Sequence, residues 1–221
     1  MTWNIPNILT VFRLLCAPAV ALAFLFLPHP VSDWVALILF GGASLTDWFD
    51  GYLARKWQQM SKFGAMLDPI ADKAMVITAI AVLAMNFGPA PLIIIPSAFI
   101  LLRETFVSGL REFLGETAGL LKVTKLAKWK TTTQMVAIAV LFSYGVFSHY
   151  LGMGTFGMDG ATMDAILAGD IDDETGLKVS YYGAFLSYGG GVILLWIAAI
   201  LTVLSGGDYL MKAMPYLRED A

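Results

Sequence analysis

The sequence predicts an all-α membrane protein that crosses the bilayer several times, and two observations support this. First, 58% of the 221 residues are hydrophobic and 14% are charged, and the mean hydropathy is +0.72, well beyond the range of soluble globular domains. Second, the apolar residues form runs long enough for a helix to cross about 30 Å of hydrocarbon. We expect six transmembrane helices, near residues 14–27, 34–54, 66–87, 91–110, 133–151 and 182–205.

The residues between these spans predict their orientation. Pro28-His29-Pro30 and the stretch 86–91 are short breaks, so the helices on either side are expected to be antiparallel. Lys and Arg lie before the first span, between the second and third, between the fourth and fifth and after the sixth, whereas the opposite side carries only Lys178. Because basic residues are retained in the cytoplasm, both termini are predicted to be cytoplasmic, in a multi-pass protein of the inner (plasma) membrane.

Two further segments complete a single membrane domain over residues 1–221. Residues 1–13 are predicted to form a juxtamembrane helix that lies on the cytoplasmic surface. A cleaved signal peptide is the weaker alternative, because the apolar run continues past Ala23 to Leu27. Residues 152–181, rich in Gly and Asp, are predicted to be an extracytoplasmic loop, where a solvated acidic surface is favoured over a calcium site. The net charge of −3 gives no indication of a nucleic-acid partner.

Four aspartates interrupt the second and third apolar segments, namely Asp47, Asp50, Asp68 and Asp72. An aspartate at the centre of a membrane-spanning helix costs roughly 2.5 to 3.5 kcal/mol, so a cluster of four indicates that a cation offsets their charge. At about 3.6 residues per turn, each pair lies on one side of its own helix. Because the connection 56–62 is short, the two pairs are expected to face each other near the cytoplasmic surface.

The same two helix faces carry small residues and one arginine, namely Gly51, Ala54 and Arg55 on the first helix and Gly64 on the second. Oxygen ligands favour Mg²⁺ or Mn²⁺, and four carboxylates favour two metal ions of the kind that assist phosphoryl-type displacements. Small residues leave space for a base or a pyrophosphate, and a guanidinium binds phosphate oxygens. Close helix packing is the alternative explanation for the small residues, but it does not explain the aspartates.

These residues form one motif, D-x2-D-G-x2-A-R-x8-G-x3-D-x3-D, which runs from Asp47 to Asp72 with all eight fixed positions present. The motif resembles the signature of the CDP-alcohol phosphotransferase family. The resemblance implies a cytoplasm-facing site and a homodimer, in which CDP-diacylglycerol donates its phosphatidyl group to an alcohol and CMP is released. It also implies that the four aspartates hold two metal ions, that Asp72 is the general base, and that Gly51, Ala54, Arg55 and Gly64 line the cytidine and pyrophosphate pocket.

Polar residues near the start of the first span, Asn7, Thr10 and Arg13, and Thr46 before the motif are further candidates for contact with the nucleotide. A role as interfacial polar residues and a topology signal explains Asn7, Thr10 and Arg13 nearly as well. For the acceptor, Arg103 and Arg111 lie on one side of the fourth span, and Lys122, Lys125, Lys128 and Lys130 lead into the fifth. Such cations suit an anionic acceptor. Retention in the cytoplasm also explains the lysines, and an ion pair with Glu104 or Glu112 is the alternative for Arg103.

Stretches near residues 4–13, 67–73, 103–112 and 128–134 are similar to one subfamily, the phosphatidylglycerophosphate synthases. The similarity implies glycerol 3-phosphate as the acceptor and phosphatidylglycerol phosphate as the product, whereas the last helix adds nothing specific. Phosphatidylglycerol, serine and inositol phosphate are the alternative acceptors. A divalent metal transporter is the alternative of another class, disfavoured because the aspartates cluster toward one side and no internal repeat is seen.

Overall fold

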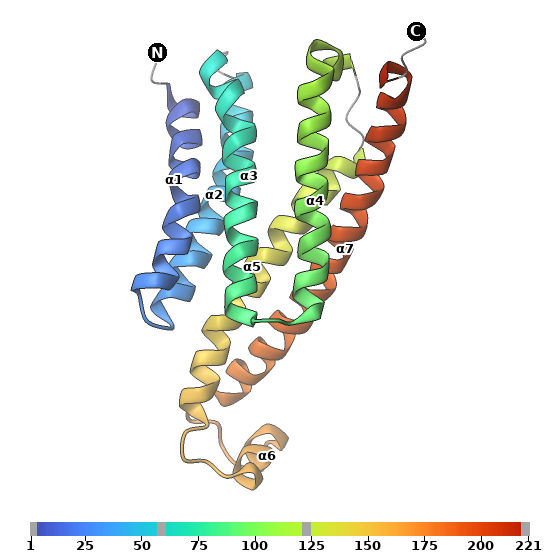
Figure 1. Ribbon diagram of the computed structural model, residues 1–221. Coiled ribbons are helices and arrows are strands. Elements are labelled where there is room, and N and C mark those ends of the chain that lie inside the picture. The colour runs from blue at the N-terminus through green and yellow to red at the C-terminus, as the bar shows by residue number, and fades with distance from the viewer. Residues whose placement is uncertain (1–3, 57–60, 121–124, 218–221) are drawn as a thin grey trace. The chain divides into compact units, whose positions relative to one another are not determined.

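The computed structural model describes residues 4–56, 61–120 and 125–217, apart from the side chains of residues 47–56, 116, 118, 120 and 125–128. The described residues are helical or form short connections, and none of them is in a strand, so the predicted all-α class is confirmed (Figure 1). The helices are α1 (Ile5–Phe26), α2 (Val31–Lys56), α3 (Lys62–Phe87), α4 (Pro91–Leu114), the 3₁₀-helix η1 (Gly115–Leu120), α5 (Lys125–Gly154), α6 (Gly160–Ala168) and α7 (Leu177–Leu217).

Five helices within the described residues are long and apolar enough to cross a membrane, which supports a multi-pass protein. These five are α1, α3, α4, the segment Trp129–Gly154 of α5, and α7. The described apolar part of α2, Val31–Thr46, is shorter. The count of six spans and the cytoplasmic position of both termini therefore stay predictions.

The beginning of the chain differs from the prediction. Among the described residues, no separate helix precedes the first span, because α1 continues unbroken from Ile5 to Phe26. The Asn4 side chain caps α1 by accepting a hydrogen bond from the Asn7 backbone N–H at 3.0 Å, and Pro6 lies in the first turn, where proline is tolerated. Three polar side chains in this part of α1, those of Asn7, Thr10 and Arg13, are buried in the protein.

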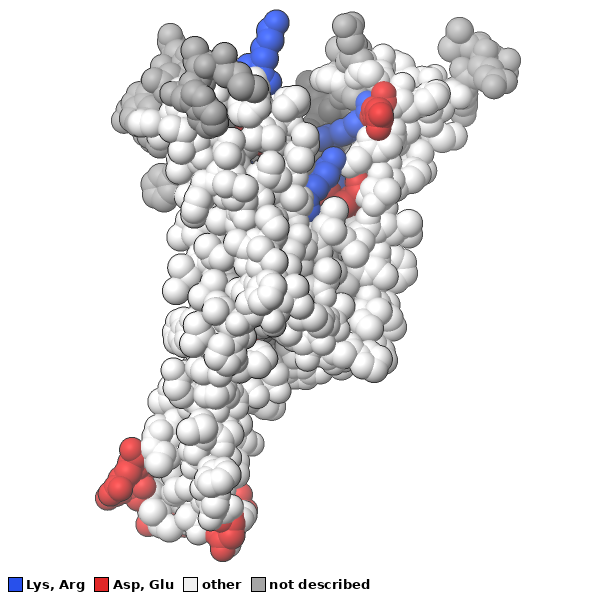
Figure 2. All heavy atoms as spheres, turned by 60° about the vertical axis from the view of Figure 1, so that its left-hand side comes forward, with Lys and Arg blue, Asp and Glu red and all other residues white. Residues whose placement is uncertain are grey.

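The acidic segment between α5 and α7 contains α6, and two of its aspartates cap helices. Asp159 Oδ1 accepts from the Thr162 backbone N–H at 2.9 Å, and the Asp173 carboxylate accepts from the backbone N–H groups of Leu177 and Lys178 at 2.8 and 2.9 Å. The bonds from Lys178 and Leu177 lower the pKa of Asp173, and hydrogen bonding from Thr162 lowers that of Asp159. Acidic side chains gather at the end that carries α6 (Figure 2).

The chain divides into two compact units. Unit 1 comprises Met1–Leu83 and Ile138–Gly191, and unit 2 comprises Ala84–Ala137 and Val192–Ala221. In unit 1, α1 and α2 lie side by side (Figure 1). The ring of Phe142 on α5 stacks on Phe24 of α1 at 6.1 Å and meets the edge of Phe40 of α2 at 5.7 Å, measured between ring centroids. In unit 2, the indole N–H of Trp196 on α7 donates to the Leu92 carbonyl of α4 at 3.1 Å.

A buried carboxylate in unit 1 depends on a glycine. Asp33 of α2 is only 2% exposed, and its Oδ2 lies 2.5 Å from His29 Nδ1. A Cβ atom at Gly145 of α5 would overlap Asp33 Oδ1 and lie 2.6 Å from its Cγ. The absence of a side chain at position 145 therefore lets α5 approach this carboxylate.

We expect Gly145→Ala to lower the free energy of unfolding by about 2 kcal/mol, because the added methyl group displaces a buried carboxylate from its partner. The matched control is Gly152→Ala on the same helix, where a Cβ would meet nothing within 4 Å. Unfolding of the two purified variants in mixed detergent micelles measures the difference. Equal stability of the two variants would contradict the assigned role of Gly145.

Candidate functional site

A row of buried polar side chains on α1 faces the carboxylates of α3 in unit 1. Asn7, Thr10 and Arg13 recur every three residues and are all nearly fully buried, with Arg13 only 1% exposed. Thr10 Oγ1 donates to Asp68 Oδ1 at 2.6 Å, and Arg13 Nη1 donates to Asp72 Oδ1 at 2.6 Å. Both aspartates of α3 are thus held by a donor from α1, in charge-assisted hydrogen bonds of the short, strong kind.

The third member of this row meets the glycine of the motif. Ser61 Oγ donates to Asn7 Oδ1 at 2.7 Å and accepts from the Gly64 backbone N–H at 3.0 Å. A Cβ atom at Gly64 would lie 2.7 Å from Asn7 Oδ1, closer than such atoms pack. The structure therefore gives Gly64 a packing role between α1 and α3, which is one of the two explanations that the sequence left open.

The α3 carboxylates remain accessible despite these contacts. The Asp72 side chain is 40% exposed, and Asp68 is partly exposed as well. Because the two residues lie one helical turn apart, they present oxygen atoms on one side of α3. Asp72 can therefore reach a ligand while its position is fixed by Arg13.

The part of the predicted site that belongs to α2 is only partly described. α2 is helical through Lys56, as the proposed stripe requires, and Thr46 Oγ1 donates to the Ala43 carbonyl of its own helix at 2.8 Å. The side chains of the remaining motif residues lie outside the described part of the chain, namely Asp47, Asp50, Gly51, Ala54 and Arg55. Among the described side chains, no three His, Cys, Asp or Glu residues gather at one point, so the metal site stays a prediction.

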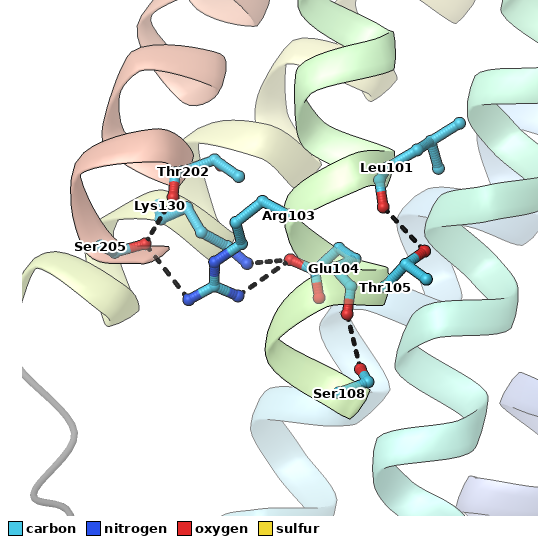
Figure 3. A network of polar contacts seen from close by, with 8 residues as sticks. All are labelled: Leu101, Arg103, Glu104, Thr105, Ser108, Lys130, Thr202 and Ser205. Atoms are coloured by element: carbon cyan, nitrogen blue, oxygen red, sulfur yellow. Dashed lines mark hydrogen bonds and ion pairs between the residues drawn. The ribbon is translucent and has the colours of Figure 1, made fainter. Parts of the chain in front are cut away.

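A second polar cluster lies in unit 2, where α4, α5 and α7 each contribute a side chain (Figure 3). Arg103 Nη1 of α4 lies 3.3 Å from Oε1 of the neighbouring Glu104. Arg103 Nη2 donates to Ser205 Oγ of α7 at 3.2 Å. Lys130 of α5, which is 6% exposed, donates to the same Glu104 oxygen. The ion pair with Glu104 that the sequence left as an alternative for Arg103 is therefore present.

A further cation interacts with this cluster electrostatically. Arg111 lies two turns along α4 from Arg103, and its guanidinium carbon is 5.3 Å from the centroid of the Tyr209 ring of α7. Arg103, Arg111 and Lys130 are close enough to repel one another, whereas Glu104 attracts both Arg103 and Lys130. Among its described groups, the cluster thus contains three cations, Arg103, Arg111 and Lys130, and one carboxylate, that of Glu104. Such an excess of positive charge in apolar helices favours an anionic ligand.

The sequence matches a known family. Residues 3–158 match the sequence model of the family described as CDP-alcohol phosphatidyltransferase. The chain belongs to this family.

Curated relatives bear the name CDP-diacylglycerol–glycerol-3-phosphate 3-phosphatidyltransferase. The protein from Cereibacter sphaeroides is 54% identical over 224 residues, which cover 100% of both chains. The protein from Haemophilus influenzae is 36% identical over 216 residues, 96% of this chain and 95% of the relative. The protein from Escherichia coli strain K12 is 39% identical over 159 residues, 71% and 86% of the two chains.

Family membership confirms the resemblance read from the motif, and the structure distributes the predicted residues over two clusters. Thr10, Asp68 and Asp72 belong to the α1–α3 cluster, to which Asn7 and Gly64 are joined through Ser61. Arg103 and Arg111 belong to the unit 2 cluster. The side chains of Lys125 and Lys128 lie outside the described residues.

Sequence reasoning missed Ser61, Ser205 and Tyr209, which the structure places in these clusters. It named Arg13 from its spacing with Asn7 and Thr10, but it did not predict the pair with Asp72. Lys130 follows Lys125 and Lys128 but differs from a surface lysine only by its burial. Ser205 and Tyr209 lie in the apolar helix α7, beyond residue 158, where the match to the family model ends. No signal in the sequence distinguishes them from the other residues of that helix.

The pair formed by Arg13 and Asp72 is expected to couple the stabilities of α1 and α3. In a double-mutant cycle with Arg13→Met and Asp72→Asn, we expect a coupling energy of about 1–2 kcal/mol, reduced from that of a fully buried pair because Asp72 is half exposed. Unfolding in mixed micelles without divalent metal measures it. Arg13→Lys, which retains the charge, serves as the control and should lose less stability than Arg13→Met. Strictly additive effects of the two substitutions would contradict the pair.

Proposed function

We propose that the protein transfers the phosphatidyl group of CDP-diacylglycerol to glycerol 3-phosphate, forming phosphatidylglycerol phosphate and releasing CMP in phospholipid biosynthesis. The observation that carries the proposal is the full-length, 54% identical relative named for this activity. The unit 2 cluster supports it independently, because three cations with one carboxylate suit a phosphorylated acceptor. Serine and phosphatidylglycerol lack a phosphomonoester, and this argues against them as acceptors.

Two Mg²⁺ or Mn²⁺ ions are the cofactors that the donor site is suited to hold. The described donors are carboxylates, the ligands that such hard cations prefer, and Asp68 and Asp72 present them on one side of α3 with their positions fixed by Thr10 and Arg13. Asp47, Asp50, Asp68 and Asp72 would hold the ions. When bound, the ions would neutralise negative charge on the pyrophosphate and so make CMP a better leaving group.

The residues of the chain then have separate roles in the transfer. Asp72 accepts the proton of the acceptor hydroxyl as its oxygen forms a bond to the phosphorus of the phosphatidyl group and the bond to the CMP oxygen breaks. Thr10 positions Asp68, since its hydroxyl donates to that carboxylate. The nucleotide pocket would be formed by Asn7, Thr46, Gly51, Ala54, Arg55 and Gly64.

For the acceptor, Arg103 and Arg111 would bind the phosphate of glycerol 3-phosphate, and Lys125, Lys128 and Lys130 of α5 would add positive charge. Glu104 holds Arg103 and Lys130 in fixed positions through one shared oxygen while neutralising only one unit of their charge. Preorganised cations of this kind reduce the entropy lost when a small anion binds. We further propose a location in the inner membrane with the active site facing the cytoplasm, an orientation that the distribution of Lys and Arg supports. The proposed homodimer rests on the family resemblance alone.

The function is tested by incubating the purified protein with CDP-diacylglycerol, Mg²⁺ or Mn²⁺, and a panel of acceptors, and by measuring CMP release. We expect release with glycerol 3-phosphate, little with serine, and none after chelation of the metal. Asp72→Asn is the matched inactive variant, because it keeps the shape of the side chain while removing the base and the ligand charge. Release of CMP with serine but not with glycerol 3-phosphate would overturn the proposed acceptor.

The role of Arg103 is tested by Arg103→Ala. Loss of a charge-assisted contact to phosphate, worth roughly 1.5–3 kcal/mol, should raise the KM for glycerol 3-phosphate at least tenfold and change the KM for CDP-diacylglycerol little. Lys212→Ala is the control, because Lys212 is a basic residue of unit 2 that pairs with Asp208 at the surface at 2.8 Å. Equal rises in both KM values for Arg103→Ala would mean that Arg103 has a structural role instead.

A further inference from the structure

Ser205 of α7 is oriented as a hydrogen-bond acceptor for Arg103. Ser205 is buried, and its hydroxyl donates to the Thr202 carbonyl one turn earlier at 3.0 Å. Because a hydroxyl carries a single proton, the bond to Thr202 leaves the Ser205 oxygen to accept from Arg103 Nη2, which lies 3.2 Å away (Figure 3). The backbone of α7 thereby determines the direction of the Arg103 contact.

Gly206 provides the space that Arg103 occupies. A Cβ atom at this position would lie 2.9 Å from Arg103 Cγ, 3.5 Å from Nε and 3.8 Å from Cδ. The aliphatic part of Arg103 therefore lies directly on the backbone of α7, at a distance that only glycine permits. At the adjacent Gly207, a Cβ atom would meet nothing within 4 Å. The requirement for glycine is thus specific to the position beneath Arg103.

Tyr209 lies one turn after Ser205 and holds the second arginine through its ring. It is 6% exposed, and the guanidinium carbon of Arg111 lies 5.3 Å from the ring centroid. Its hydroxyl is buried and has no hydrogen-bond partner among the described residues. The aromatic ring, rather than the hydroxyl, is therefore the part of Tyr209 that contributes to the cluster, through the attraction between a cation and the face of a ring.

The three residues share a property that Glu104 lacks, since none of them carries a charge. Glu104 orients Arg103 and Lys130 but also neutralises part of their positive charge. A serine oxygen, a glycine backbone and a tyrosine ring orient the two arginines without changing the net charge of the cluster. A phosphate dianion binds most strongly when the cations are both fixed in position and uncompensated.

We propose that α7 determines the specificity for a phosphorylated acceptor, with Ser205, Gly206 and Tyr209 as positioning residues that direct Arg103 and Arg111 toward the phosphate. The proposal rests on the proposed function of the unit 2 cluster as the site that binds the acceptor phosphate. It assigns a role to a helix that lies beyond residue 158, where the match to the family ends. The expected consequence is that substitutions in α7 change the affinity for the acceptor selectively.

The test compares Gly206→Ala with Gly207→Ala, and Tyr209→Leu with Tyr209→Phe. Two quantities are measured for each purified variant: the KM values for glycerol 3-phosphate and CDP-diacylglycerol, and the rise in melting temperature that glycerol 3-phosphate causes without the donor. For Gly206→Ala and Tyr209→Leu we expect the KM for glycerol 3-phosphate to rise about tenfold, the ligand-induced rise in melting temperature to shrink, and the KM for CDP-diacylglycerol to change less than twofold. Gly207→Ala should behave like the wild type, and Tyr209→Phe should lie closer to the wild type than Tyr209→Leu.

Several results would overturn the proposal. One is equal behaviour of Gly206→Ala and Gly207→Ala. Another is a parallel rise of both KM values together with a lower melting temperature, because this would indicate a general packing defect. Failure of glycerol 3-phosphate to shift the melting temperature of the wild-type protein would also contradict it. A wild-type protein that binds glycerol 3-phosphate selectively through α7 but releases no CMP would refute the proposed function and support the role of α7.

Discussion

The ion pair between Arg13 and Asp72 is the interaction on which the donor side of the structure depends. An arginine that is 1% exposed in an apolar helix is stable only with a partner inside the protein. Asp72 is such a partner, at 2.6 Å. The bond fixes the register of α1 against α3, and the other two contacts follow from this register, with Thr10 opposite Asp68 and Asn7 opposite Gly64. The same contacts therefore pack α1 against α3 and position the carboxylates of Asp68 and Asp72.

This register also explains why α1 is a single helix. A surface helix over residues 1–13 would direct its polar residues to the lipid headgroups, whereas in the structure they contact α3. Once Arg13 is paired inside the protein, the residues before it continue the same helix at the same spacing. The polar pattern was correctly identified in the sequence, but the partner of that pattern was not.

In the unit 2 cluster, the cations are held by two kinds of partner: a charged one, Glu104, and neutral ones, Ser205 and Tyr209. Glu104 shares one oxygen between Arg103 and Lys130, and this keeps a partly buried and a buried cation close together while neutralising part of their charge. Ser205 and Tyr209 hold the arginines without that loss. A cluster that is tightly organised and still positively charged is what recognition of a small phosphate requires, because preorganisation lowers the cost of ordering and the net charge supplies the attraction.

The sequence by itself determined the membrane class, the helical architecture, the family and the motif residues, because hydropathy, charge placement and the spacing of the aspartates are local properties of the chain. It identified Arg103 but could not choose between an anionic ligand and an ion pair with Glu104, and the structure shows that the ion pair forms within a cluster that keeps an excess of cations. Only the tertiary structure placed Arg13 on Asp72, and Ser205, Gly206 and Tyr209 beside the arginines. Arg13 and Asp72 are 59 positions apart in the chain, and Arg103 and Ser205 are 102 positions apart. No local pattern encodes such pairings, because a serine, a glycine or a tyrosine in an apolar helix has the same sequence signature whether it faces lipid or an arginine.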